Sequence, residues 1–207
     1  MRIETTETSI RLVERRESDG LWVVRWDFKP KLDSEGIYWY EEESYNWIPS
    51  IEDIQRTIVE WYNKQTDGVI KHGFTWKGIN VLLNEENKFN FALFAIEAER
   101  RKNAIEKWDK ENPELSGMNV TISHGTDEDG NEVDILIPTG RPSSRIPITF
   151  KLSESNDNNN FYTFTTLEEL FEFTSSSADH LQGAYDAGWY KIATFDWSPY
   201  IKALEEL

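Results

Sequence analysis

A β-hairpin signature constrains the fold of this chain more than any other feature. The dipeptide Asp129-Gly130 lies between two strand-like segments, 119–122 and 132–137. Asp-Gly favours the tight turn that joins neighbouring antiparallel strands, because glycine readily adopts the positive φ that such a turn needs. The sequence therefore predicts antiparallel β-structure, with one hairpin spanning about residues 117–140.

Several other segments have the composition and alternation of β-strands. In the run 21–28, the side chains at alternate positions would share one face of a strand: Trp22, Val24, Trp26 and Phe28. Ile10 and Leu12 would share a face in a strand before it. We also predict strands at 37–40, 146–152 and 161–164, and two short strands within 69–83, broken at Gly73 and Gly78.

Three segments have helical signals. Ser50 begins the first with a capping pattern, and Asp67-Gly68 is expected to end it. The second spans about 85–109. Its first half has a broad apolar face of Phe89, Leu93 and Ile96, with Phe91, Phe94, Ala95 and Ala98 alongside, and its second half is densely charged. Thr166 caps the third, which we expect to end at Gly188, leaving 189–192 as a short strand or extended arm.

These segments together predict an α+β fold, with antiparallel hairpins packed against about three helices. We divide the chain into a β-rich region with one amphipathic helix at 1–70 and an α+β region at 71–207. The hairpin at 117–140 is an insertion in the second region.

The charge and composition exclude several classes of function. There are 22 Lys and Arg residues against 38 Asp and Glu, a formal net charge of −16. Such a surface repels phosphate backbones and anionic lipids, so we expect neither nucleic-acid nor membrane binding. The chain has no cysteine, which excludes disulfides and thiol chemistry. Its N-terminus has no signal-peptide pattern and no stretch is long and apolar enough to span a membrane.

The sequence predicts no catalytic centre, metal site or cofactor. The three histidines, His72, His124 and His180, are more than 50 residues apart and follow no metal-binding spacing. The segment that begins at Asp127 resembles the start of a calcium loop. However, Glu132 occupies the position that needs glycine, and Pro138 the position that needs a bidentate carboxylate. We therefore expect a protein that is not an enzyme.

Contact residues are the remaining candidates for function. Aromatic residues concentrate near the N-terminus, where they could form the core, a sugar-stacking platform or a subunit contact. The charged helix end could project toward a partner, or could be a solvated end held by ion pairs between successive turns. The candidate contact residues are Trp22, Trp26, Trp39, Tyr40, Trp47, Arg100, Arg101, Asp129 and Gly130.

From residue 73 onward, the order of short motifs resembles a domain of unknown function found in bacteriophage tail-fibre and tail-tip proteins. His180 lies near the end of the third predicted helix, as in that pattern. The matching segments are 73–78, 79–83, 90–92, 147–151, 161–164 and 197–201. The insertion at about 102–145 is not part of the pattern. The family has no established catalytic residues, so the resemblance implies an assembly role without chemistry.

The resemblance implies a virion structural protein of the tail, tail tip or neck. It would be made in the host cytoplasm and would contact other phage structural proteins, as a homo-oligomer or in symmetric copies. Two alternatives stay open. The chain could be a module that binds a host glycan, which the tryptophans suggest, or a tail-fibre assembly chaperone that is absent from finished particles.

Overall fold

A computed structural model describes residues 1–144, 146–153 and 160–207. It confirms the α+β prediction. The chain folds as two compact units, one formed by Met1–Val69 with Gly183–Leu207 and the other by Ile70–Gln182. The sequence had assigned all of 71–207 to one region. The structure instead groups the C-terminal segment with the N-terminal one.

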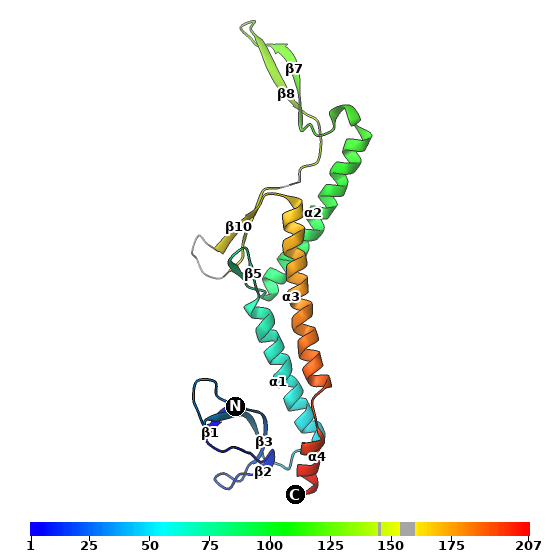
Figure 1. The fold of residues 1–207 in the computed structure, drawn as a ribbon. Helices are drawn as coiled ribbons and strands as arrows, with labels where there is room; N and C mark the ends of the chain where they lie inside the picture. The colour runs from blue at the N-terminus through cyan, green and yellow to red at the C-terminus, as the bar shows by residue number, and fades with distance from the viewer. Residues whose placement is uncertain (145, 154–159) are drawn as a thin grey trace. The chain divides into compact units, whose positions relative to one another are not determined.

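The first unit contains a four-stranded antiparallel sheet (Figure 1). Its strands are β1 (Arg2–Thr5), β2 (Val13–Arg15), β3 (Trp22–Pro30) and β4 (Tyr38–Tyr45), in the order β1-β4-β3-β2. The sequence analysis missed β1, which is short and has no apolar run. Its backbone pairs with β4 from one end to the other, so the strand exists because the long neighbouring strand offers a free edge.

A bulge in β3 changes the face on which one predicted residue lies. The pairing with β4 shifts between Trp26 and Lys29, and Asp27 adopts a φ of 57°. Two residues of β3 therefore oppose one residue of β4, which reverses the alternation after the bulge. Phe28 consequently lies on the face opposite Trp26, where its ring stacks on Tyr38 with the centroids 5.1 Å apart. The prediction of one shared face was wrong at this residue.

Two helices cover the core face of this sheet. They are α1 (Ile51–His72), of which the part up to Val69 belongs to this unit, and α4 (Ser198–Glu205). The buried cluster comprises Val13, Val24, Trp26, Tyr45, Ile54, Ile58 and Tyr200. The Tyr200 hydroxyl donates a hydrogen bond to the Arg25 carbonyl oxygen at 2.9 Å, which joins α4 to β3. The sequence analysis did not predict α4.

The first helix is longer than predicted. It continues through Gly68 to His72, so residues 69–72 are helical and not part of a strand. Gly73 ends the helix with a φ of +69°. A Cβ atom there would lie 1.6 Å from the Val81 carbonyl oxygen. This position accepts only glycine, for its backbone angle and for its space.

The third helix also passes the glycine that was expected to end it. Helix α3 spans Leu167–Ala193, so 189–192 are helical. A Cβ atom on Gly188 would lie 2.2 Å from the Thr66 Oγ1 atom of α1. Gly188 therefore permits close packing of two helices, a role that its sequence context does not distinguish from helix termination.

In the described ranges, the second unit contains three separate antiparallel hairpins together with α2 (Glu85–Glu111) and the first part of α3. The hairpins are β5 (Phe74–Trp76) with β6 (Ile79–Val81), β7 (Val120–Thr126) with β8 (Glu132–Pro138), and β9 (Ile148–Lys151) with β10 (Phe161–Phe164). Phenylalanine rings form the core. Phe173 contacts Phe91 and Phe164, with centroids 4.8 and 5.0 Å apart.

One carboxylate links three elements of this unit. Glu169, in the first turn of α3, accepts hydrogen bonds from the Lys77 ammonium, the Tyr162 hydroxyl and the Thr165 backbone amide. The Thr166 hydroxyl accepts the Glu169 amide at 3.2 Å, which confirms the predicted cap. The Lys77 and Tyr162 hydrogen bonds lower the pKa of Glu169 to about 2.

Candidate interaction surfaces

The inserted segment forms the predicted hairpin. Strands β7 and β8 pair with each other from Val120 opposite Pro138 to Thr126 opposite Glu132. In the turn, the Asp127 carboxylate accepts the backbone amides of Asp129 and Asn131 at 3.0 and 2.8 Å. The carboxylate that resembled a calcium ligand thus holds the turn together. Throughout the described ranges, no group of three or more acidic or histidine side chains is arranged to hold a metal ion.

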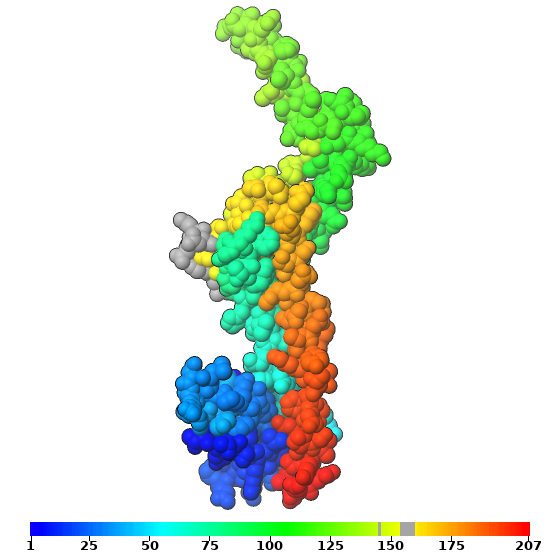
Figure 2. Space-filling model, in the orientation of Figure 1, coloured from blue at the N-terminus to red at the C-terminus, as the bar shows by residue number. Residues whose placement is uncertain are grey.

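The hairpin exposes apolar side chains on both faces. Every residue of β8 is exposed, and the space-filling view shows both strands uncovered on the face that is drawn (Figure 2). On one face, Ile122 and Leu136 lie opposite each other and are 60% and 63% exposed. On the other face, β8 presents a row of three apolar side chains: Val133, Ile135 and Ile137.

Such a hairpin lacks the burial that normally stabilises one. An isolated two-stranded hairpin is marginally stable in water, and a third strand or a packed helix is usually needed. A contiguous apolar surface of this kind marks an interaction site in a soluble protein. The β7–β8 hairpin is therefore the strongest candidate for a contact element in the part of the chain that the structure describes.

The base of the hairpin is fixed to the second helix. Arg141 makes a two-point ion pair with Asp109 of α2, with Nε–Oδ1 and Nη2–Oδ2 distances of 2.7 and 2.8 Å. The Gly117 amide also donates to Asp109 Oδ1, at 3.3 Å. The Arg141 hydrogen bonds hold the pKa of Asp109 below its ordinary value. The base of the hairpin is thus anchored to α2, although no other described element packs on its exposed strand β8.

A second exposed apolar surface lies on the first half of α2, where the sequence analysis predicted a broad apolar face. Phe89, Leu93 and Ile96 are 67%, 49% and 65% exposed. The buried residues of α2 are Phe91 and Ala98, which belong to the same predicted apolar face. The first half of the helix is apolar around much of its circumference, so periodicity alone did not identify the face that packs against the core. We call Phe89, Leu93 and Ile96 the α2 stripe.

Ion pairs between successive turns hold the charged half of α2, as the second of the two interpretations of this segment predicts. Glu97 accepts hydrogen bonds from Arg100 and Arg101, one helical turn away. These bonds lower the Glu97 pKa to about 2. Arg101 also donates to the Ser143 carbonyl oxygen at 2.8 Å, in the segment after the hairpin. Arg101 is thus a bracing residue within the unit, and Arg100, with 69% of its side chain exposed, stays available at the surface.

The N-terminal aromatic residues do not form one platform. Trp26 and Tyr40 are buried, and the register places them on opposite faces of the sheet. Trp39 is half-buried, with the Arg2 guanidinium 3.3 Å from its ring centroid. Trp22 is half-buried against the core cluster. Trp47 is 55% exposed. The core interpretation holds for Trp26 and Tyr40, and only Trp47 of the five is classed as exposed.

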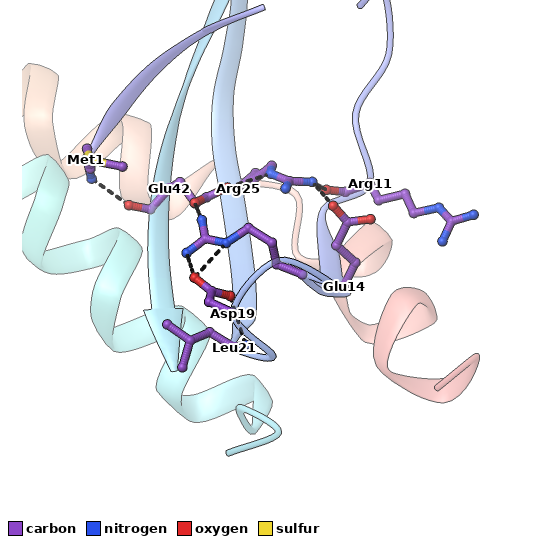
Figure 3. Close-up of polar contacts among 8 residues, drawn as sticks. Met1, Arg11, Glu14, Asp19, Leu21, Arg25 and Glu42 are labelled. Carbon is purple, nitrogen blue, oxygen red and sulfur yellow. Dashed lines mark hydrogen bonds and ion pairs between the residues drawn. The ribbon is translucent and has the colours of Figure 1, made fainter. Parts of the chain in front are cut away.

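Charged side chains are buried on the face of the sheet opposite the core cluster. Figure 3 shows their polar contacts. The Glu42 carboxylate accepts hydrogen bonds from Arg25 Nε at 2.8 Å and from Arg16 Nη1 at 2.6 Å. Arg25 also reaches Glu14 through Nη1 and donates to the Arg11 carbonyl oxygen at 3.2 Å. The Glu42 and Arg25 side chains are only 2% and 11% exposed. The network joins β2, β3 and β4, so it acts on stability.

The histidines are distributed among different environments. His124 Nδ1 lies 2.7 Å from the Asp134 carboxylate on the neighbouring strand of the hairpin, and the His180 ring packs against Phe74 with the centroids 5.8 Å apart. His72 is the last residue of α1.

Comparisons with known proteins do not connect the chain to any family. No family model matches the sequence, and neither a curated protein nor a solved structure matches it significantly. Within the described ranges, none of the helices combines the length and the apolarity required to cross a bilayer.

Proposed function

We propose that this chain is an assembly protein that acts through protein–protein contact. The observation that carries the proposal is the β7–β8 hairpin, which is anchored at its base by Arg141 and Asp109 and exposes apolar side chains on both faces. The α2 stripe adds a second apolar surface on the same unit. An acidic chain gains solubility from its net charge, and the apolar surfaces then supply specific contacts.

The setting that we propose is a bacteriophage virion, in the tail, tail tip or neck. The support is the order of motifs from residue 73 onward, which resembles a domain of phage tail-fibre and tail-tip proteins. One feature of the fold agrees with a contact role: the strands of the hairpin at 120–138 are the least covered of the described strands. The hairpin itself is not part of the motif pattern.

The test of the assembly role replaces the hairpin strands without disturbing their anchor. Asn119 and Thr139 form the last pair at the base, with the Thr139 amide donating to the Asn119 carbonyl oxygen at 3.0 Å. Replacing residues 120–138 by the two-residue turn Asn-Gly keeps this pair and the Arg141–Asp109 contact. We expect a folded protein, shown by an unchanged thermal transition of the helices, that no longer enters phage particles.

Quantitative mass spectrometry of purified particles and of the infected-cell lysate provides the measurement. A copy number in particles that is a multiple of three, six or twelve supports a structural component. Abundance in the lysate with absence from particles would instead indicate the assembly chaperone. A truncated protein that enters particles as well as the intact chain would contradict the hairpin's role, and association with no phage would contradict the proposed setting.

A further inference from the structure

The two long edges of the β7–β8 hairpin differ in what they offer to another strand. The Thr139 amide donates to the Asn119 carbonyl oxygen, and the Asp127 amide to that of Asn131, each at 3.0 Å. Bonded and non-bonded pairs alternate along an antiparallel ladder. The odd-numbered residues of β7 therefore bond to β8, and the even-numbered residues point their amides and carbonyls outward: Val120, Ile122, His124 and Thr126.

The outer edge of β8 is protected, whereas that of β7 is not. By the same alternation, the outward-facing residues of β8 are Glu132, Asp134, Leu136 and Pro138. Pro138 has no amide hydrogen, and acidic side chains discourage the approach of another strand along an edge. The outward residues of β7 include no proline and no acid. In the described ranges, no hydrogen bond reaches their outward backbone groups.

We propose that the outer edge of β7 pairs with the same edge of a second copy of this chain. The two β7 strands would run antiparallel, with a two-fold axis beside Ser123. In this register Val120 lies opposite the partner's Thr126, and Ile122 opposite the partner's His124. All four outward-facing residues are then paired, whereas a shift of two residues leaves one of them unpaired on each strand. The inference rests on the proposed assembly role, although not on the phage setting.

The charge distribution favours a second copy in this orientation. Segment 117–140 contains no lysine or arginine, and its turn carries Asp127, Glu128 and Asp129. A parallel pair would bring two acidic turns together, at a cost in repulsion. The antiparallel pair separates the turns and places Asp127 opposite the partner's Asn119. Arg141 Nη1 lies 3.5 Å from the Asn119 side-chain oxygen within each chain, so the guanidinium that pairs with Asp109 would lie near each acidic turn.

The side chains of β7 fit the middle of a four-stranded sheet. On one face β7 carries only small residues, Thr121, Ser123 and Gly125. Ile135 leans across this row, since a Cβ on Gly125 would lie 2.6 Å from its Cδ1 atom. In the dimer, the two rows of small residues lie side by side between the apolar rows of the two β8 strands. Four strands also meet the minimum that gives a sheet independent stability.

A cysteine scan tests the register directly, because the chain has no cysteine of its own. With Ser123→Cys, the two thiols would face each other in a non-bonded pair, where Cα atoms are about 4.5 Å apart. This separation permits a disulfide. With Thr121→Cys on the same face, the two Cα atoms would be about 14 Å apart, a separation that does not permit a disulfide. Under mild oxidation we expect a covalent dimer of the first variant, and at least tenfold less of the second on a non-reducing gel.

A proline pair tests the edge without introducing a thiol. Ile122 and Leu136 lie opposite each other, are exposed to similar extents and direct their amides away from the hairpin. Ile122→Pro removes a donor from the edge that pairs, and Leu136→Pro removes one from the edge that does not. By sedimentation velocity of the full chain, we expect dimers for the wild type and for Leu136→Pro, and monomers for Ile122→Pro.

The outcomes separate this inference from the proposed function. The wild type is measured in a 100-fold dilution series that begins at about 100 μM, a concentration well above the dissociation constant of a specific contact. A wild type that is monomeric throughout this series overturns the self-pairing. Equal cross-linking of the two cysteine variants overturns it as well. If the hairpin is nevertheless required for entry into particles, the assembly role stands and the hairpin binds another protein. If the chain forms the dimer but associates with no phage, the self-pairing stands and the proposed phage setting is wrong.

Discussion

The buried charge network of the first unit gives the sharpest prediction about stability. Glu42→Leu removes a carboxylate whose side chain is 2% exposed and leaves Arg25, 11% exposed, without its most buried partner. Arg25 retains Glu14, which is 28% exposed. Breaking a buried ion pair from one side leaves an uncompensated charge and costs about 3–5 kcal/mol. We expect Glu42→Leu to lose this much unfolding free energy.

The double variant determines whether the cost comes from the orphaned charge. With Arg25→Leu added, both buried charges are gone, and replacing a buried pair by apolar residues is often close to neutral. The former partners of the two residues, Arg16 and Glu14, are 30% and 28% exposed, so their charged groups can be solvated in the double variant. The double variant should therefore be more stable than either single variant, with a coupling energy of about 3 kcal/mol.

Urea unfolding followed by tryptophan fluorescence measures these differences, since Trp26 is 3% exposed in the core of the same unit. The matched control is Glu4→Leu, which breaks the ion pair with Lys31 where the side chains are 58% and 41% exposed. An exposed pair contributes about 0–1 kcal/mol. If Glu42→Leu costs no more than Glu4→Leu, or if the double variant costs the sum of the single ones, the reasoning is refuted.

Two further predictions concern the second unit. Glu169 has a pKa of about 2, below its ordinary 4.5, so its ionised form stabilises the fold. The difference in urea midpoint between the wild type and Glu169→Gln should therefore be constant above about pH 5.5. It should shrink as the pH falls from about 4.5 toward 2. A midpoint difference that grows in acid would contradict this. Gly78→Ala, at a φ of +84° in open space, should cost about 1–2 kcal/mol by thermal unfolding. Gly73→Ala should cost at least twice as much, since its Cβ would meet the Val81 carbonyl oxygen at 1.6 Å; equal costs would contradict the packing argument.

Local signals in the sequence predicted much of the secondary structure. Asp129-Gly130 predicted the hairpin because the tight turn between Asp127 and Asn131 needs a residue with a positive φ, and Gly130 adopts a φ of 84°. Ser50 and Thr166 predicted helix starts because their hydroxyls accept amides only three residues away, as the structure confirms at 3.2 Å in both cases. Such interactions lie within one turn of the chain, so composition and spacing are enough to determine them.

Contacts with other elements of the fold decide which glycine ends a helix and on which face an apolar side chain lies. Gly73 ends a helix and Gly188 does not, since the first meets the backbone of β6 and the second packs against Thr66 of α1. Phe28 changed faces because a bulge in β3 shifts its register with β4. In each case the deciding partner belongs to another helix or strand, so the pattern of the segment itself does not contain it.

For the candidate contact surface as well, the sequence determined one part and the tertiary structure another. The sequence by itself determined that residues 117–140 form an acidic-tipped hairpin and that the first half of α2 is apolar. Only the tertiary structure decided that Phe91 is buried while the α2 stripe is exposed, and that β8 has no cover. The physical reason is that apolarity sets how much surface can be buried, whereas the packing of the other elements decides which side of it is buried and which is left for a partner.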